Sequence, residues 1–164
     1  MLREISAGGV VVRPTPQGWE VAVIEPQAEP PSARTHAKSH KKELLALPKG
    51  LIDPGEKPAE TAVREVLEET GIHAKILEKL TDIKYAYVRT WGDHQRVFKI
   101  VSFYLLLYGS GTIDELSSDM RIEVRRARWV PIEEAERKLA YRGERDVIKR
   151  ARERLQLHQE EAQP

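Results

Sequence analysis

The stretch from residue 50 to residue 72, GLIDPGEKPAETAVREVLEETGI, constrains this chain most, because it fixes where one helix begins and ends. Pro58 suits a first helical position, and Gly71 suits a left-handed residue just past a helix end. We therefore predict a helix between them. Its apolar arc, which can pack on a core, holds Ala59, Ala62, Val63, Val66, Leu67 and Thr70.

The opposite edge of this predicted helix is acidic. Glu65, Glu68 and Glu69 stand at positions i, i+3 and i+4, so they share one face. Like charges one turn apart cost a free helix on the order of a few tenths of a kcal/mol, and a bound dication would reverse that sign. Carboxylate oxygens suit Mg²⁺, with Mn²⁺ as a possible substitute, and magnesium often shares its shell with substrate phosphates. The pattern predicts a magnesium site that takes a phosphorylated small molecule.

The whole stretch also resembles the signature motif of the Nudix hydrolases. That motif is a glycine, five residues, a glutamate, seven residues, then Arg-Glu-apolar-x-Glu-Glu-x-Gly-apolar. Its fixed positions are filled here by Gly50, Glu56, Arg64, Glu65, Glu68, Glu69 and Gly71. An ordinary solvated acidic helix would explain a bare ExxEE, but not the complete motif. The resemblance implies a Nudix fold, an α/β/α sandwich around a mixed β-sheet, and a Mg²⁺-dependent pyrophosphohydrolase.

The resemblance also implies roles for the motif residues. Metal ligands would be Glu65, Glu68 and Glu69, and a backbone carbonyl near the first glycine adds Gly50. In the family an arginine and an early glutamate orient these ligands, so Arg64 and Glu56 are expected to support them. The resulting catalytic group contains Arg64, Glu68 and Glu69.

A second candidate for the general base, beside Glu69, lies outside the motif. Glu123 stands six residues before Trp129, and similar polyphosphate hydrolases carry a glutamate ahead of such a tryptophan. The neighbouring arginines could instead hold Glu123 in a surface ion pair. Those neighbours are Arg121, Arg125 and Arg126.

Four further residues are candidates for substrate binding. Lys49 directly precedes the motif, where its ammonium could reach a phosphate oxygen. Tyr85 and Tyr87 alternate along a predicted strand and share one face, where one could stack a base or simply pack at a sheet edge. Lys42 ends the basic segment RTHAKSHKK, which either recruits a polyphosphate or is only solvated.

These features together resemble diadenosine and diphosphoinositol polyphosphate hydrolases, so we expect a dinucleoside polyphosphate as substrate, such as diadenosine polyphosphate. Nucleoside triphosphates, RNA 5′ ends, diphosphoinositol polyphosphates and ADP-ribose stay open. ADP-ribose members tend to carry a proline past the motif, and none lies between Gly71 and Pro131. A hypothesis of another class is a non-catalytic Nudix domain that only binds a ligand.

Composition bounds the remaining possibilities. A chain of 164 residues with 40% hydrophobic and 32% charged residues fits a single domain over residues 1–164. It has no cysteine, which excludes disulfides and thiolate zinc sites. The longest apolar stretch, residues 100–108, has strand length, so we expect a cytoplasmic protein without a membrane partner. A net charge of +1 gives no field that would attract nucleic acid, apart from a possible RNA 5′ end. No pattern indicates an oligomeric state.

The rest of the chain reads as mixed α/β with strands that do not form a regular βαβ array. Before the motif we predict strands at 5–12 and 19–24 joined by a turn at 15–18, then a flexible basic loop at 25–42 and a short strand at 44–47. After the motif we predict β-rich stretches at 74–90 and 96–108 joined by a turn at 91–94, and a strand at 124–130. The chain then ends in a short helix opened by Pro131, a helix at 142–157 and a tail that frays after His158.

Overall fold

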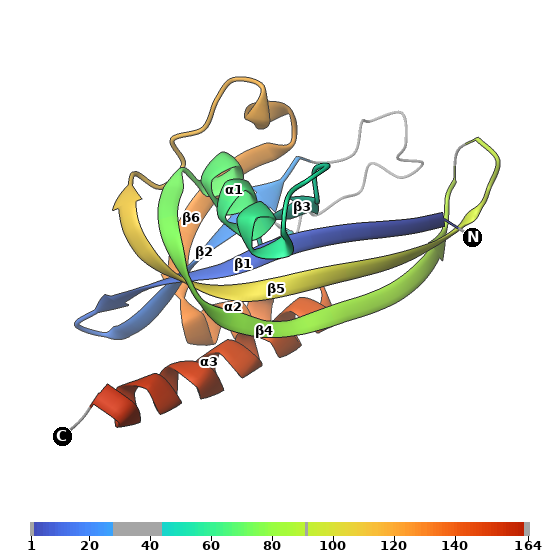
Figure 1. Ribbon diagram of the computed structural model, residues 1–164. Coiled ribbons are helices and arrows are strands. Elements are labelled where there is room, and N and C mark those ends of the chain that lie inside the picture. Colours follow the sequence, from blue (N-terminus) through green and yellow to red (C-terminus); the bar gives the residue numbers. More distant parts are fainter. Residues whose placement is uncertain (1, 28–43, 91, 163–164) are drawn as a thin grey trace.

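The computed structural model describes residues 2–27, 44–90 and 92–162 of the chain (Figure 1). Its elements are β1 (Leu2–Thr15), β2 (Gly18–Pro26), β3 (Lys49–Leu51), α1 (Pro58–Thr70), β4 (Ile72–Val88), β5 (Arg96–Gly111), the 3₁₀-helix η2 (Met120–Ile122), β6 (Val124–Pro131), α2 (Ile132–Lys138) and α3 (Arg142–Ala162). Within these described residues, no helix combines the length and apolar character needed to cross a membrane.

The six strands form one mixed sheet in which β1 is central and forked. The strand order is β4-β5-β1-β2-β6, and β3 pairs with β1 off this path. β1 runs parallel to β5 from Leu2 to Val12, but pairs with β2 only from Val12 to Thr15. Beyond the fork, the chain around Ala46–Leu51 bridges both strands, because Ala46 pairs with β2 and β3 pairs with β1. The functional residues gather in this fork.

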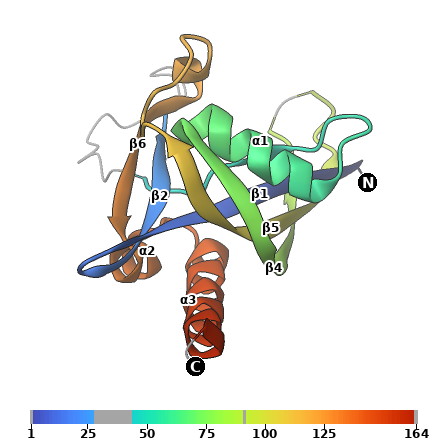
Figure 2. The same ribbon diagram turned by 60° about the vertical axis from the view of Figure 1, so that its left-hand side comes forward.

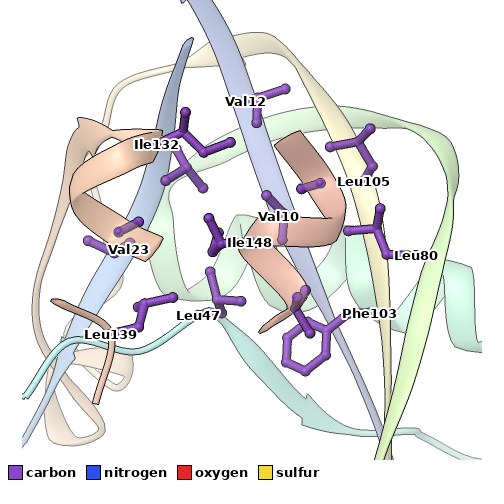
Figure 3. Packing of buried hydrophobic residues seen from close by; sticks show 14 of the residues in the cluster. Val10, Val12, Val23, Leu47, Leu80, Phe103, Leu105, Ile132, Leu139 and Ile148 are labelled. Carbon is purple, nitrogen blue, oxygen red and sulfur yellow. The ribbon is translucent and has the colours of Figure 1, made fainter. Parts of the chain in front are cut away.

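Side-chain alternation along β1 builds a core on each face of the sheet. Val10 and Val12 point into a large core covered by α2 and α3, whereas Val11 points into a smaller core under α1. Figure 2 shows α1 on one face and the two C-terminal helices on the other. Figure 3 shows Val10, Leu105 and Ile148 meeting in the larger core. The predicted α/β/α sandwich around a mixed sheet is confirmed.

Helix α1 forms where the local sequence predicts it. Pro58 occupies the first turn, and the Glu60 carboxylate accepts the Lys57 backbone N–H at 2.9 Å, which satisfies a donor that the helix leaves unpaired. Gly71 ends the helix at φ 84°, and a side chain there would lie 2.6 Å from the carbonyl oxygen of Thr112. The prediction for this helix is confirmed at both ends.

Other predicted elements are corrected by the structure. The strand expected at 44–47 is wrong: only an isolated bridge at Ala46 forms, because the Leu47 N–H bonds to a side chain and Pro48 has no N–H to donate. Pro131 ends β6 and precedes α2 instead of opening it. Residues 25–26 belong to β2 and Gln27 directly follows it, while residues 28–42 of the predicted basic loop, including Lys42, lie outside the described residues.

The predicted fraying after His158 is also wrong, because α3 continues to Ala162. Its last turns are held to the sheet by polar contacts with Glu78 on β4. The Glu78 carboxylate pairs with the Arg154 guanidinium and lies 2.7 Å from His158 Nε2.

Candidate functional site

Two glutamates of α1 are buried against the chain just before the helix. Glu65 and Glu69 are 8% and 7% exposed. A Cβ on Gly50 would lie 2.2 Å from Glu65 Oε1, so only a glycine leaves room for this carboxylate. Glu69 Oε1 accepts the backbone N–H of Lys49 at 2.9 Å. The two carboxylates therefore pack directly on the Lys49–Gly50 backbone.

Burial makes both carboxyl groups weaker acids than free glutamate. Removal from water raises the pKa of Glu69 to about 8, although the Lys49 N–H favours the ionised form, and the negative Glu65 raises it further. Burial also raises the pKa of Glu65, against the opposing effect of Arg64. Adjacent buried carboxylates are costly unless a cation neutralises them. The pair is therefore an electrostatic site for a cation.

Arg64 is the hub that holds the surrounding carboxylates. Its Nε donates to Glu56 Oε2 at 2.7 Å, and its Nη1 donates to Glu65 Oε1 at 2.8 Å and to Glu68 Oε2 at 3.2 Å. Its Nη2 donates to the carbonyl oxygen of Leu51. Hydrogen bonding to Arg64 lowers the pKa of Glu56 to about 2. This geometry lets Glu56 anchor Arg64 while Arg64 orients Glu65.

Glu68 lies apart from the buried pair. Its side chain is 41% exposed and contacts Arg64, so the three glutamates of the acidic edge do not share one pocket. Glu68 lies at the exposed edge of α1, whereas the packing of α1 on the sheet buries Glu65 and Glu69.

Glu123 faces the buried pair across a shared cavity. The 3₁₀-helix η2 ends at Glu123, and its negative charge raises the pKa of both Glu65 and Glu69. No ion pair joins Glu123 to any residue that the structure describes, whereas Arg121 pairs with Asp114 at 2.8 Å. The cavity of about 530 Å³ is lined by Ser6, Ile24, Pro26, Ala46, Leu47, Lys49, Gly50, Leu51, Asp53, Glu65, Glu69, Lys99, Glu123 and Tyr141.

The donor set of this cavity fits a divalent cation. Four acidic residues line it together with the Gly50 backbone, and this is the oxygen-rich chemistry that Mg²⁺ and Mn²⁺ prefer: Asp53, Glu65, Glu69 and Glu123. Across the described residues, no three acidic or imidazole groups already converge as metal ligands would. One reason is that Arg64 engages Glu65 and draws Glu68 outward. Glu65 and Glu69, with the carbonyl of Gly50, could hold the cation, and Glu68 could join by leaving Arg64.

Lys49 connects this cavity to a second, more apolar one. Its Nζ lies 2.7 Å from Glu144 Oε2 on α3, and Glu144 Oε1 accepts the Leu47 N–H at 2.7 Å. Burial opposes the charge on Lys49, but Glu144 outweighs burial and raises its pKa. The second cavity, of about 390 Å³, is lined by Lys49, Ile83, Tyr85, Val101, Phe103, Tyr141, Gly143 and Glu144.

The two predicted tyrosines are treated differently by the fold. Their rings share a face, with centroids 6.3 Å apart, as the strand alternation predicts. Only Tyr85 lines the second cavity, and burial raises its pKa. The Tyr87 hydroxyl donates to Glu4 Oε1 at 3.0 Å instead. Trp129, the tryptophan that follows Glu123, is half-buried against Arg13 and Tyr108.

Sequence reasoning missed five polar side chains of these cavities: Ser6, Asp53, Lys99, Tyr141 and Glu144. A signal existed for two of them. Glu144 continues the buried helical stripe of Val147, Ile148 and Ala151. Lys99 lies on the same face of β5 as the buried residues Val97 and Val101. A charged residue on an apolar face marks a position where the fold must supply a partner.

Comparison with known proteins agrees with this architecture. The family model described as NUDIX domain matches residues 10–151. The chain is 36% identical over 154 residues to a putative mutator protein MutT4 of Mycobacterium tuberculosis, covering 93% of this chain and 56% of that protein. It is 56% identical over 37 residues to a putative 8-oxo-dGTP diphosphatase of Bacillus subtilis, covering 23% of this chain and 25% of that protein. The chain thus spans about half, or less, of the length of these relatives.

Solved structures share the fold at low identity. A C. elegans Ap4A hydrolase in a binary complex superposes with a TM-score of 0.65 at 22% identity, over 93% of this chain and 97% of that one. The NUDIX domain of Shewanella oneidensis NrtR complexed with ADP ribose superposes with a TM-score of 0.68 at 18% identity, over 94% and 90%. Together with the family model and the buried motif glutamates, these matches establish that the chain belongs to the NUDIX family.

Proposed function

We propose that this protein is a divalent-metal-dependent pyrophosphohydrolase, formed by a single domain over residues 1–164, that cleaves a phosphoanhydride bond in a nucleoside diphosphate linked to a second group. The observation that carries the proposal is the buried pair Glu65 and Glu69, packed on the Lys49–Gly50 backbone, where Arg64 contacts Glu65 but no ion pair reaches Glu69 among the described residues. Such a pair is stabilised by added positive charge, and a divalent metal held by these carboxylates would supply it beside a pyrophosphate.

The chain's own residues then divide the work. Glu65, Glu69 and the Gly50 carbonyl hold Mg²⁺, for which Mn²⁺ can substitute, and Glu68 completes the set. When bound, the cation neutralises phosphate charge and makes water more acidic. Glu69 and Glu123 are the two candidates to accept the water proton, and the lack of an ion pair between Glu123 and any described residue supports its candidacy.

Arg64 and Glu56 keep the ligands in place. The guanidinium contacts Glu65 directly, and Glu56 fixes the guanidinium with two hydrogen bonds. This support holds the Glu65 carboxylate in a fixed position on α1, one turn from Glu69.

The substrate that the site supports best is a dinucleoside polyphosphate such as diadenosine polyphosphate. Lys49 places an ammonium at the boundary between the acidic and apolar cavities, where it can bind phosphate. Tyr85 and Tyr141 line the apolar cavity, which suits a stacked base. The fold shared with an Ap4A hydrolase is consistent with this choice.

A product assay on a substrate panel tests the proposal. Purified protein is incubated with Mg²⁺ in ¹⁸O-water with each of five compounds: diadenosine tetraphosphate, a nucleoside triphosphate, ADP-ribose, a diphosphoinositol polyphosphate and a 5′-triphosphate RNA. Mass spectrometry then identifies the products and the phosphate group that carries ¹⁸O. We expect Glu69→Gln to lower kcat by about 10²–10³-fold, since a preorganised charge at the reacting phosphate is lost. Glu153→Gln, on the exposed face of α3, is the matched control. Near-wild-type turnover by the Glu69 variant would contradict the metal assignment, and a wild type that binds but cleaves nothing would indicate a ligand-binding domain.

A further inference from the structure

A buried serine in the acidic cavity has no partner. Ser6 is 1% exposed, and its Oγ makes no hydrogen bond within the described part of the chain. It nevertheless lines the cavity that holds Glu65 and Glu69. An unsatisfied buried hydroxyl is rare and costly, so its presence in a cavity wall points to a ligand that completes it.

Two lysines line the same cavity. In the β1–β5 register Ser6 pairs with Val101, so Lys99, two residues earlier on β5, projects to the same face as Ser6. Lys49 shares this face, because it pairs with Gly8 of β1. The hydroxyl and both ammonium groups thus come from the face covered by α3, opposite the face that carries the α1 carboxylates.

Among the described residues, Lys99 makes only one long ion pair. Its Nζ lies 3.9 Å from Glu4 Oε2, beyond hydrogen-bond distance, and its side chain is only 20% exposed. Burial lowers its pKa, the negative charge of Glu4 partly opposes this, and the positive charge of Lys49 lowers the pKa further. An anion placed between the two lysines would relieve both effects and accept a hydrogen bond from Ser6.

We propose that Ser6, Lys49 and Lys99 form a second phosphate subsite, distinct from the pyrophosphate position at the α1 carboxylates. This inference rests on the proposed function and narrows its substrate class. A substrate that fills both positions needs at least three consecutive phosphates, so the protein selects polyphosphates over diphosphates such as ADP-ribose. The unpartnered serine is then a specificity determinant for chain length.

Ser6→Ala is expected to change two measured quantities differently: the stability of the ligand-free protein, which should not fall, and the affinity for tripolyphosphate, which should fall. Removing an unpaired hydroxyl leaves no partner behind, so the free energy of unfolding of the ligand-free protein should stay equal or rise. Binding should weaken, because the ligand loses a donor. We expect inorganic tripolyphosphate in EDTA to raise the melting temperature of wild type, and Ser6→Ala to need about 5-fold more of it for the same rise. Ser110→Ala, at an exposed position of β5, is the control.

Lys99→Gln tests the charge. Its apparent Kd for tripolyphosphate in EDTA should rise about 10-fold, with a smaller change for pyrophosphate. In steady state with Mg²⁺, KM for diadenosine tetraphosphate should rise by a similar factor while kcat stays near wild type. Lys84→Gln, exposed on β4 on the opposite face of the sheet, is the matched control.

The outcomes separate this inference from the proposed function. If wild type hydrolyses polyphosphates but the Ser6 and Lys99 variants behave as their controls, the subsite is wrong and the enzyme assignment stands. If no compound is cleaved, yet tripolyphosphate binding depends on both residues, the subsite stands and the enzyme assignment fails. A Ser6→Ala protein that loses stability would show that the hydroxyl is structural, and would overturn the subsite.

Discussion

Glu69 on α1 and Glu144 on α3 are both buried glutamates that contact the same short segment from opposite faces of the sheet. Glu144 binds the Lys49 ammonium and the Leu47 N–H, each at 2.7 Å. Glu69 has only the backbone N–H of Lys49, and its pKa rises to about 8. Burial is common to both, so burial alone does not mark a functional carboxylate. The two glutamates differ in their partners within the described residues, since an ammonium pairs with Glu144 whereas no ion pair reaches Glu69.

The largest test of this contrast is removal of each carboxylate. Glu144→Ala strands a mostly buried ammonium and a buried backbone N–H, so we expect the free energy of unfolding to fall by about 2–3 kcal/mol. Glu69→Gln should cause no loss in metal-free buffer at pH 7, because a pKa of about 8 already favours the neutral carboxyl there and the amide oxygen can still accept the Lys49 N–H. Urea denaturation of both variants in EDTA measures the difference. Equal destabilisation would mean that Glu69 is a structural residue like Glu144.

Gly50→Ala sharpens the comparison at the carboxylate itself. The new Cβ would lie within 2.6 Å of all three carboxyl atoms of Glu65, so the carboxylate must move. We expect metal affinity to fall about 10-fold or more, as for the loss of a group that orients a ligand. Titration with Mn²⁺ measures this fall. In a Glu65→Ala background the same change should have little further effect, and a full additive loss there would exclude the steric explanation.

The smallest expected effect is a pH dependence of the metal-free protein. The folded pKa of Glu69, about 8, lies above its ordinary value of 4.5. The stability associated with its protonated form is therefore complete below pH 4.5 and is lost as the pH rises through about 8. Wild type should lose stability over this range relative to Glu69→Gln, and saturating Mn²⁺ should remove the difference. Urea denaturation of both proteins at pH 5 and at pH 9 in EDTA measures the difference. An equal change in the free energy of unfolding between the two pH values for both proteins would contradict the raised pKa.

The parts of the site that the sequence predicted are those encoded locally. The helix from Pro58 to Thr70 depends on a proline, a glycine and a 3.6-residue period, and each acts within a few residues. The shared face of Tyr85 and Tyr87 follows from strand alternation in the same way. The motif resemblance then supplied the layered fold that the periodicity alone did not specify.

The parts that the sequence did not predict depend on contacts between distant segments. Glu144 reaches Leu47 across 97 positions in the chain, and that contact also explains why no strand forms at 44–47. Glu68 and Glu69 are adjacent in sequence, yet only the packing of α1 on the sheet decides which of them is buried. Likewise, only the tertiary structure shows that Tyr85 faces a cavity while Tyr87 bonds to Glu4.

The forked central strand has a consequence for how the chain finds its native pairing. Val10, Val11 and Val12 are apolar on both faces, so a slip of β1 by one position would still bury a valine on each side. The neighbouring pair Gly8 and Gly9 does not permit that slip, because any side chain there would lie 2.5 Å from the Pro48 carbonyl oxygen or 2.7 Å from Val66. The register of β1 in the sheet is therefore fixed at Gly8 and Gly9, and Gly8 is two residues from Ser6. The residues that shape the ligand cavity also decide which way the strand faces.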